Sequence, residues 1–445
     1  MKRYEAYKPS GTAWFTSVPE PWNILKINAL FSQRKEKVSD KDFAPISVTK
    51  NGIMPQLETA AKTDDGDNRK KVCVGDFVIN SRSDRKGSCG VSPFDGSVSL
   101  INIVLQPRQE LNGRYAHYLL RSQPFSEEFY RNGRGIVADL WTTRYSEMKN
   151  ILLPVPPRNE QDQIVRYLDW QVSKINRLIA AKRKQIQLLK ERQKTCIAHI
   201  VQCGLDDNAV TRDSGIEYIG IVPSHWLVLQ NRRLFHSMNR IFQGTPTVLS
   251  LSQKDGLIPY SEMSERSLHT SSYENWQLVH ENDLVLNRFK AHLGVFFASK
   301  YEGIVTFHYG VYEPRKPLVA KYYEALYHTS SYCRVYAGQS RGMTVGLQNL
   351  SDTNFYSTYT VYPPYEEQVE IVSEISRIEK QHSQIIASIV SQIEMLQDLR
   401  TRLISDVVTG QIDVRSIKVP DYEHYDEAPE NATEESSDSD YDTEE

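Results

Sequence analysis

Two stretches of sequence decide the fold: Pro156-Pro157-Arg158-Asn159-Glu160-Gln161 and Pro363-Pro364-Tyr365-Glu366-Glu367-Gln368. A proline pair forces an extended approach and removes backbone donors. The acidic and amide residues that follow it suit the positive N-terminal end of a helix. Each stretch therefore predicts the start of a long helix, of roughly 40 residues and about 60 Å at 1.5 Å per residue.

Both stretches belong to an internal repeat. Ser10-Gly11 and Trp22 recur 204 residues later as Ser214-Gly215 and Trp226. A small insertion between about residues 56 and 71 then changes the offset to 207. The matches at this second offset include Phe77-Val78-Ile79-Asn80 with Leu284-Val285-Leu286-Asn287, Pro107-Arg108 with Pro314-Arg315, and Arg134-Gly135 with Arg341-Gly342. Convergent turn chemistry does not place so many matches on two offsets, so the chain is a module, a helix, a second module and a second helix.

Each module is predicted to be a mixed α+β domain of roughly 150 residues. Strands are expected at Phe77-Val78-Ile79, Val98–Leu105, Val285-Leu286 and Gly303–Phe307, and short helices at Tyr115–Leu120 and Tyr322–Tyr327. The predicted fold class is α+β, with two similar domains separated by a long antiparallel coiled coil of two helices and related by a pseudo-twofold internal repeat. The predicted boundaries are 1–157, 158–206, 207–364, 365–414 and a tail at 415–445.

The second long helix carries apolar residues at the 3.5-residue spacing of a coiled coil. One seam position holds Ile371, Ile378, Ile385 and Leu399, and the other holds Ile375, Ile389, Leu396 and Leu403. The first long helix has a rougher stripe that includes Ile164, Leu168, Ile175 and Leu189. A helix with one apolar stripe must bury it, so the two helices are expected to pair in antiparallel.

The formal net charge of −3 conceals a basic body. From Asp421 to the end the chain has 12 acidic residues and no Lys or Arg, which leaves 44 acidic residues against 53 basic ones. Such an excess of positive charge suits a polyanionic partner. The tail has little to bury and is expected to be disordered. It either solubilises the protein or competes with the polyanion for the basic surface.

Basic and amide residues gather in equivalent loops of the two modules. Arg pairs with guanine edges, and Asn and Gln pair with adenine. The candidate DNA-binding residues are Arg82, Arg85, Lys86, Arg131, Arg134 and Arg144 in the first module, and Arg288, Lys290, Gln339, Arg341, Gln348 and Asn349 in the second. Each loop is either a DNA contact or an ordinary solvated turn, and a basic loop residue contacts a phosphate more often than a base.

No sequence pattern points to catalysis, to a metal or to a membrane. GxxxxGK[ST] and HExxH motifs are missing, as is any run of 18 apolar residues. Tyr362-Pro363-Pro364-Tyr365 resembles the Asn/Asp-Pro-Pro-Tyr motif of adenine methyltransferases, but Tyr362 replaces the residue that would hold the amino group. Five cysteines without a CxxC pair favour a reducing cytoplasm and neither disulfides nor a zinc site.

The motifs of both repeats resemble the specificity subunits of type I restriction–modification systems. Asp213-Ser214-Gly215-Ile216-Glu217-Tyr218-Ile219-Gly220, with Pro223-Ser224-His225-Trp226, resembles the start of a target recognition domain in that family. The segment 363–368 resembles the end of such a domain, and Leu403–Val414 resembles the family's distal conserved region. The resemblance covers about residues 1–415. The first copy departs from it at Asn159 and Cys203, which puts the choice of partner subunit in doubt.

The resemblance implies a non-catalytic subunit that reads an asymmetric bipartite site in double-stranded DNA. Residues 1–157 and 207–364 would be the target recognition domains, and 158–206 and 365–414 the central and distal conserved helices. Two methyltransferase subunits would bind largely through the helices, and motor–restriction subunits would join them. These partners would supply S-adenosylmethionine, ATP and Mg, so the chain itself would need no cofactor. The assembly would methylate adenine, or cleave unmodified DNA, in the cytoplasm.

Two other functions compete with this one. A self-contained methyltransferase or nuclease needs a cofactor-binding domain, for which a repeat over about 415 residues leaves no room. A coiled-coil scaffold without DNA readout does not need basic loops at equivalent positions, such as those of Arg134 and Arg341.

Overall fold

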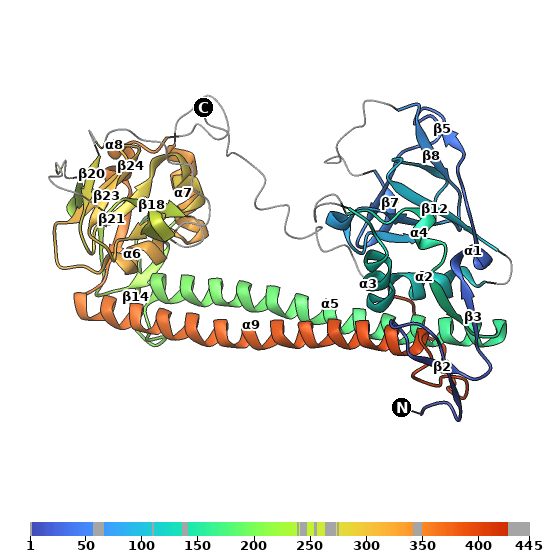
Figure 1. Ribbon diagram of the computed structural model, residues 1–445. Coiled ribbons are helices and arrows are strands. Elements are labelled where there is room, and N and C mark those ends of the chain that lie inside the picture. The colour runs from blue at the N-terminus through green and yellow to red at the C-terminus, as the bar shows by residue number, and fades with distance from the viewer. Residues whose placement is uncertain are drawn as a thin grey trace. The chain divides into compact units, whose positions relative to one another are not determined.

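The computed structural model describes residues 2–56, 66–108, 111–135, 141–237, 240, 247–252, 256–262, 273, 276–340 and 349–425. They form two compact units (Figure 1). Unit 1 holds the residues up to Arg183 together with those from Val390, and unit 2 holds Lys184–Ile389. Each unit therefore contains one β-rich module and one half of each long helix. Within the described ranges, no helix is long and apolar enough to cross a membrane.

Unit 1 contains an antiparallel four-stranded sheet in the order β10-β9-β12-β4 and a smaller sheet in the order β11-β8-β5. Its strands are β1 (Tyr7–Pro9), β2 (Ser17–Pro19), β3 (Asn23–Lys26), β4 (Phe31–Gln33), β5 (Lys37–Val38), β6 (Ile46–Thr49), β7 (Gly52–Pro55), β8 (Arg69–Val72), β9 (Phe77–Asn80), β10 (Cys89–Val91), β11 (Gly96–Val98), β12 (Asn102–Pro107) and β13 (Leu152–Val155). Its short helices are α1 (Ile27–Leu30), η1 (Ser83–Arg85), α2 (Gly113–Arg121), α3 (Gln123–Arg131) and α4 (Tyr145–Met148). The long helix α5 (Arg158–Cys203) begins in this unit.

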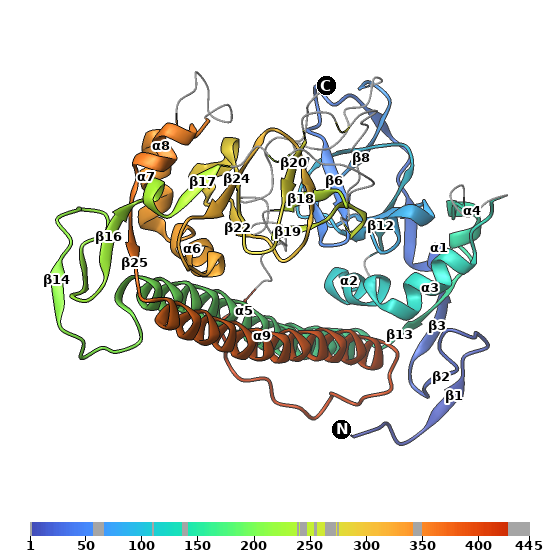
Figure 2. The same ribbon diagram turned by 90° about the vertical axis from the view of Figure 1, so that its left-hand side faces the viewer.

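Unit 2 repeats this arrangement around a four-stranded sheet in the order β17-β24-β21-β22 (Figure 2). Its strands are β14 (Thr211–Asp213), β15 (Ile221–Pro223), β16 (Leu227–Gln230), β17 (Phe235–Ser237), β18 (Leu249–Ser252), β19 (Gly256–Pro259), β20 (Gln277–Val279), β21 (Leu284–Asn287), β22 (Phe296–Ala298), β23 (Gly303–Val305), β24 (Tyr309–Pro314) and β25 (Tyr359–Tyr362). Its short helices are η3 (Asn231–Arg233), η4 (Tyr260–Glu262), η5 (Arg288–Leu293), α6 (Ala320–Tyr327), α7 (Ser330–Gln339) and α8 (Asp352–Ser357). The long helix α9 (Tyr365–Val408) begins here.

The sequence repeat is also a repeat of strand register and of core. Asn80 lies opposite Asn102 in the β9–β12 pair, and Asn287 lies opposite Tyr309 in the β21–β24 pair. Both members of the pair are thus shifted by the same 207 residues. Six buried residues share one cluster in unit 1, namely Ile46, Ile53, Val72, Val78, Val98 and Val104. Their equivalents in unit 2 are Leu249, Leu257, Val279, Val285, Val305 and Val311. The predicted α+β fold with an internal repeat is therefore confirmed.

One predicted strand is wrong in its extent. The run Val98–Leu105 is split between β11 and β12, because the chain turns between them and Asn102 N donates to Ser99 O at 3.0 Å. Alternation of apolar residues on both sides of a tight turn resembles one continuous strand. The predicted helices at 115–120 and 322–327 are present as α2 and α6.

Each module packs on the start of one long helix through a buried tryptophan. Trp22 Nε1 donates to Glu160 at 3.0 Å in unit 1, and Trp226 Nε1 donates to Glu367 at 3.0 Å in unit 2. Both indole rings are fully buried. The acidic residue after each Pro-Pro pair therefore binds its own module as well as lying at a helix N-terminus.

Each module also binds the end of the other long helix through a buried tyrosine. Tyr322 OH donates to the Val201 carbonyl at 2.7 Å in unit 2, and Tyr115 OH donates to the Val408 carbonyl at 3.2 Å in unit 1. The carbonyls in the last turn of a helix have no N–H donor within that helix. Each tyrosine hydroxyl supplies a donor to one of them. In each unit, the start of one helix thus lies beside the end of the other, as the antiparallel prediction requires.

The helix seam departs from a strict heptad. Ile164, Leu168, Ile175, Ile371, Ile389 and Leu403 are buried, and Leu189, Ile378 and Leu396 are half-buried. Ile385 and Leu399 are 45% and 50% exposed, so the series that begins at Ile371 does not stay at the seam. A straight helix drifts by about 20° for every seven residues, which carries these two side chains off the buried face. Ile393, 9% exposed, is buried there instead.

Residues 415–425, which the sequence assigns to the tail, lie against α5 in unit 1. Gln163 donates to the Ile417 carbonyl at 2.7 Å, and Arg177 donates to the Glu423 carbonyl at 3.0 Å. Tyr425 N then donates to Ser173 Oγ at 2.8 Å. The acidic stretch 426–445 lies outside the described residues.

Candidate nucleic-acid interface

Three loops that the sequence marks separately meet in unit 1. Thr142 pairs with Arg82 on one side and with Arg134 on the other, both in antiparallel bridges. Thr142 N donates to Arg134 O at 3.0 Å, and Arg134 N donates back to Thr142 O at 3.0 Å. The loop after β9, the loop after α3 and the segment before α4 are therefore joined by their backbones.

The interior of the module holds these loops in place. Thr143 is fully buried; its N donates to Ser81 O at 2.9 Å, and its hydroxyl donates to Phe129 O at 2.9 Å. Tyr130 OH donates to Arg85 O at 3.2 Å, which ties η1 to α3. The loops therefore have a rigid base although their outer residues face solvent.

All six basic candidates of the first module are exposed there: Arg82, Arg85, Lys86, Arg131, Arg134 and Arg144. Arg131 forms an ion pair with Glu128, and Arg85 lies 3.9 Å from Asp84. Exposed guanidinium groups on a backbone held in this way suit phosphate oxygens and the acceptor edge of guanine. The pKa of Glu147 is lowered, chiefly by the hydrogen bond from the Ser146 hydroxyl.

The second module builds its loop on the same scaffold. Leu350 N donates to Arg288 O at 3.0 Å, which is the bond of Thr143 to Ser81 shifted by 207 residues. The Asn287 side chain accepts from Phe289 N at 3.1 Å. In the first module, the Asn80 side chain accepts from Arg82 N at 3.0 Å. The backbone frame is thus shared, although the side chains on it differ.

Two candidates of the second module, one arginine and one glutamine, are bound to other residues of the same module. Arg288 NH1 lies 2.7 Å from Asp352 Oδ1, and its side chain is 21% exposed. Gln339 Oε1 accepts from the Thr358 hydroxyl at 2.8 Å. Lys290 and Asn349 are exposed. Arg341 and Gln348 lie outside the described residues.

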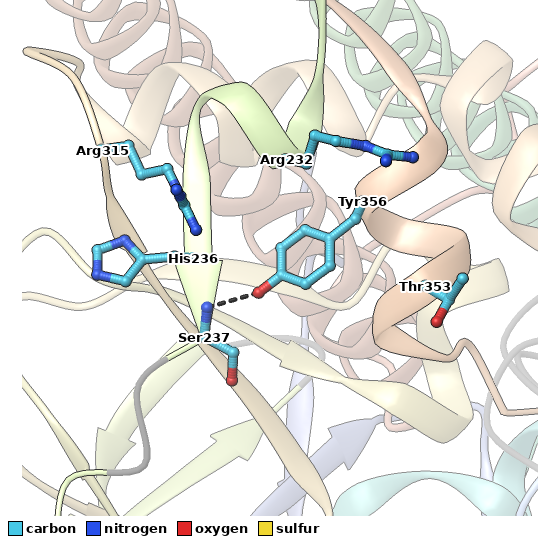
Figure 3. A pocket seen from close by; sticks show the side chains of 6 residues that line it. All are labelled: Arg232, His236, Ser237, Arg315, Thr353 and Tyr356. Atoms are coloured by element: carbon cyan, nitrogen blue, oxygen red, sulfur yellow. Dashed lines mark hydrogen bonds between the residues drawn. The ribbon is translucent and has the colours of Figure 1, made fainter.

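A cavity in unit 2 contains basic residues that sequence reasoning missed. Its volume is about 400 Å³, and its lining is Arg232, His236, Ser237, Arg315, Thr353 and Tyr356 (Figure 3). These residues come from η3, β17, the end of β24 and α8. Arg315 was visible in the repeat as the partner of Arg108, but only folding brings it to the same cavity as Arg232.

Together, the two units define a class: a duplicated α+β protein in which each module binds the start of one long helix and the end of another. No protein-family model matches the chain. No curated protein matches it either.

Three solved structures from type I restriction–modification systems match the chain at 12–14% identity. A chain from a structure of complex assembly and conformational transition of the type I R-M system has a TM-score of 0.59 at 12% identity, with 89% of this chain and 99% of that chain covered. The HsdS subunit from Thermoanaerobacter tengcongensis has a TM-score of 0.49 at 14% identity, with 89% and 98% covered. The type I S subunit from M. genitalium has a TM-score of 0.33 at 14% identity, with 87% and 96% covered. The first similarity shows that this chain has the fold of that type I R-M chain.

Proposed function

We propose that this chain is the specificity subunit of a type I restriction–modification complex and that each module reads one half of a bipartite DNA site. One observation carries the proposal: Thr143–Ser81 in unit 1 and Leu350–Arg288 in unit 2 are the same backbone bond under equivalent candidate loops. A scaffold that is duplicated while its exposed side chains change is suited to two half-sites of different sequence.

The difference between the loops supports an asymmetric site. The first module offers exposed arginines, including Arg82, Arg134 and Arg144, which suit guanine edges or phosphates. The second module offers Lys290 and Asn349, and Asn suits adenine. The bases read by the two modules are therefore expected to differ.

The chain is proposed to act without chemistry of its own. Two methyltransferase subunits would bind largely through α5 and α9, and restriction subunits would join them. Several apolar side chains of these helices are exposed and open to such a partner, among them Leu178, Leu188 and Met395. S-adenosylmethionine, ATP and Mg would be bound by the partners. The assembly would act on double-stranded DNA in the cytoplasm.

The decisive experiment is a map of adenine methylation in the strain that carries the gene, compared with a strain from which the gene is deleted. We expect one bipartite methylated motif to disappear, which would reveal both half-sites. Unchanged methylation, together with a purified chain that does not bind duplex DNA, would favour the coiled-coil scaffold. Methylation by the purified chain alone would instead favour a self-contained enzyme.

A second experiment links the motif to the loops. Arg82→Ala with Arg134→Ala should abolish methylation at the site, because one half-site is no longer held. A matched control replaces two other exposed cations of unit 1, Lys26 and Lys37, by Ala. Loss of methylation in the control to the same degree would contradict a special role for the loops.

A further inference from the structure

The cavity lined by Arg232 and Arg315 combines two guanidinium groups with hydroxyl donors. Tyr356 reaches Ser237 from α8, and Ser237 N donates to its hydroxyl oxygen at 2.5 Å (Figure 3). The phenol therefore keeps its own hydrogen for another acceptor. Arg315 Nε donates to the Phe235 carbonyl at 3.1 Å, and this bond leaves the two NH2 groups of the guanidinium for a ligand.

The acidic groups nearest to this cavity are already paired. Glu313 lies 2.7 Å from Arg240 NH2 and 3.3 Å from His236 Nε2. Asp352 lies 2.7 Å from Arg288 NH1. Among the described residues, neither carboxylate pairs with Arg232 or Arg315, although Glu313 pairs with His236 of the lining.

One buried polar atom of the lining lacks a protein partner among the described residues. His236 Nδ1 is buried, and no hydrogen bond to it is formed within that part of the chain. A buried polar atom without a partner is unfavourable, but Nδ1 is closed off from solvent, so the groups available to a ligand are the two guanidinium groups and the hydroxyls of the lining. The lining as a whole supplies donors to an oxygen-rich anion.

Helix α8 links the cavity to the candidate loop of unit 2. Thr353 follows Asp352 on α8, and Asp352 holds the guanidinium of Arg288 at the start of the loop. A strand of DNA in contact with this loop would therefore pass close to the cavity.

We infer that this cavity binds a phosphate group of the DNA backbone beside the second half-site. The inference rests on the proposed function and adds a phosphate contact to it. Fork-shaped guanidinium donors match phosphate oxygens, and a basic side chain contacts a phosphate more often than a base. The contact would fix the position of the second module on the duplex and would carry no sequence information.

The site belongs to the second module alone. Arg108 is the equivalent of Arg315, but Asn28 and Ser32 stand where the second module has Arg232 and His236. Arg108 is exposed like Arg315. Arg108→Ala is therefore a matched control, because it removes the equivalent arginine in a module where Asn28 replaces Arg232.

The test measures binding of the full-length chain to a labelled 30-base-pair duplex of random sequence, by fluorescence anisotropy between 50 and 200 mM NaCl. One phosphate contact adds about 0.9 to the slope of log K against log salt. The ratio of Kd at the two salt concentrations should therefore fall about threefold in Arg232→Ala/Arg315→Ala. Arg108→Ala should keep the wild-type ratio. Arg232→Gln, at an exposed position, repeats the test with little risk to folding.

The possible results separate failure of this inference from failure of the proposed function. The inference is overturned if the double variant keeps the wild-type ratio of Kd values, or if Arg108→Ala lowers that ratio equally. In both cases the proposed function still stands, provided that the wild type binds the duplex. A wild type that does not bind the duplex contradicts the proposed function first. Melting in inorganic phosphate, at ionic strength matched with NaCl, forms the second arm. If phosphate stabilises the wild type but not the double variant, and the double variant keeps the wild-type ratio of Kd values, the cavity binds a free anion. That result overturns the DNA contact.

Discussion

Deletion of a single hydroxyl group tests how each module is fixed to the helices. Tyr322→Phe removes the donor to the Val201 carbonyl, 2.7 Å away in the last turn of α5. Tyr322 is fully buried, so water does not replace the lost donor. The substitution removes one oxygen and leaves the ring, so the packing of the ring is kept. A buried acceptor without a partner costs about 1–3 kcal/mol.

Amide hydrogen exchange measured by mass spectrometry reports this loss for each unit separately. Because about 1.4 kcal/mol is a factor of ten, we expect slow amides of unit 2 to exchange about 5 to 150 times faster. Peptides from the module of unit 1 should keep their rates. Global unfolding curves are less suitable, because two units need not unfold in one step.

The equivalent tyrosine provides the matched variant. Tyr115→Phe removes a hydroxyl whose single hydrogen is shared between Pro154 O at 3.0 Å and Val408 O at 3.2 Å. Its effect should fall on unit 1 and spare the module of unit 2. Unchanged exchange in both variants, or the same acceleration everywhere in both, would refute the idea that each hydroxyl fixes its own module.

Three further results are expected. A Cβ on Gly410 would lie 2.4 Å from a proline ring, whereas Gly11 has a similar positive φ and open space around it. Alanine at either position should destabilise unit 1 by roughly 1–2 kcal/mol, because the backbone stays left-handed. Hydrogen exchange of unit 1 should show a larger loss for Gly410→Ala, and equal losses would contradict this. Burial, with help from neighbouring arginines, lowers the pKa of His117 to about 3. As the pH falls, the imidazole of the unfolded chain is protonated before that of the folded chain. Stability should therefore fall as the pH drops from about 6.5 toward 3. His117→Gln should flatten the fall in Tm between pH 7 and 5, and an unchanged pH profile would exclude this residue as its source. Burial raises the pKa of the Cys89 thiol to about 12, so iodoacetamide should label it more slowly than half-buried Cys73, and equal labelling would argue against burial.

The candidate loops illustrate how far sequence reasoning reaches. Composition and the repeat marked Arg82, Arg134 and Arg288 as basic residues of the candidate loops. Only the fold shows that Arg288 differs from the two exposed arginines. Its guanidinium is bound by Asp352, which comes from a segment more than 60 residues further along the chain. No pattern near Arg288 in the sequence indicates that ion pair.

The long helices show the same division. Pro-Pro followed by Glu-Gln predicted where α5 and α9 begin, since capping chemistry is local. The burial of individual seam residues could not be predicted from their neighbours in the sequence. Ile385 and Leu399 fit a heptad by spacing but are exposed, since burial depends on helix drift and on the neighbouring helix.

By itself, the sequence determined that the chain is duplicated, that long helices follow the Pro-Pro pairs, and that equivalent loops carry basic side chains. These features follow from short motifs and from their recurrence along the chain, and both can be recognised without knowing which segments pack together. Tertiary structure alone decided which cations stay exposed, how Tyr115 and Tyr322 satisfy the ends of two helices, and that Arg232 and Arg315 share one cavity. Burial, ion pairing and cavities arise between segments far apart in sequence, and they are settled only when the chain packs.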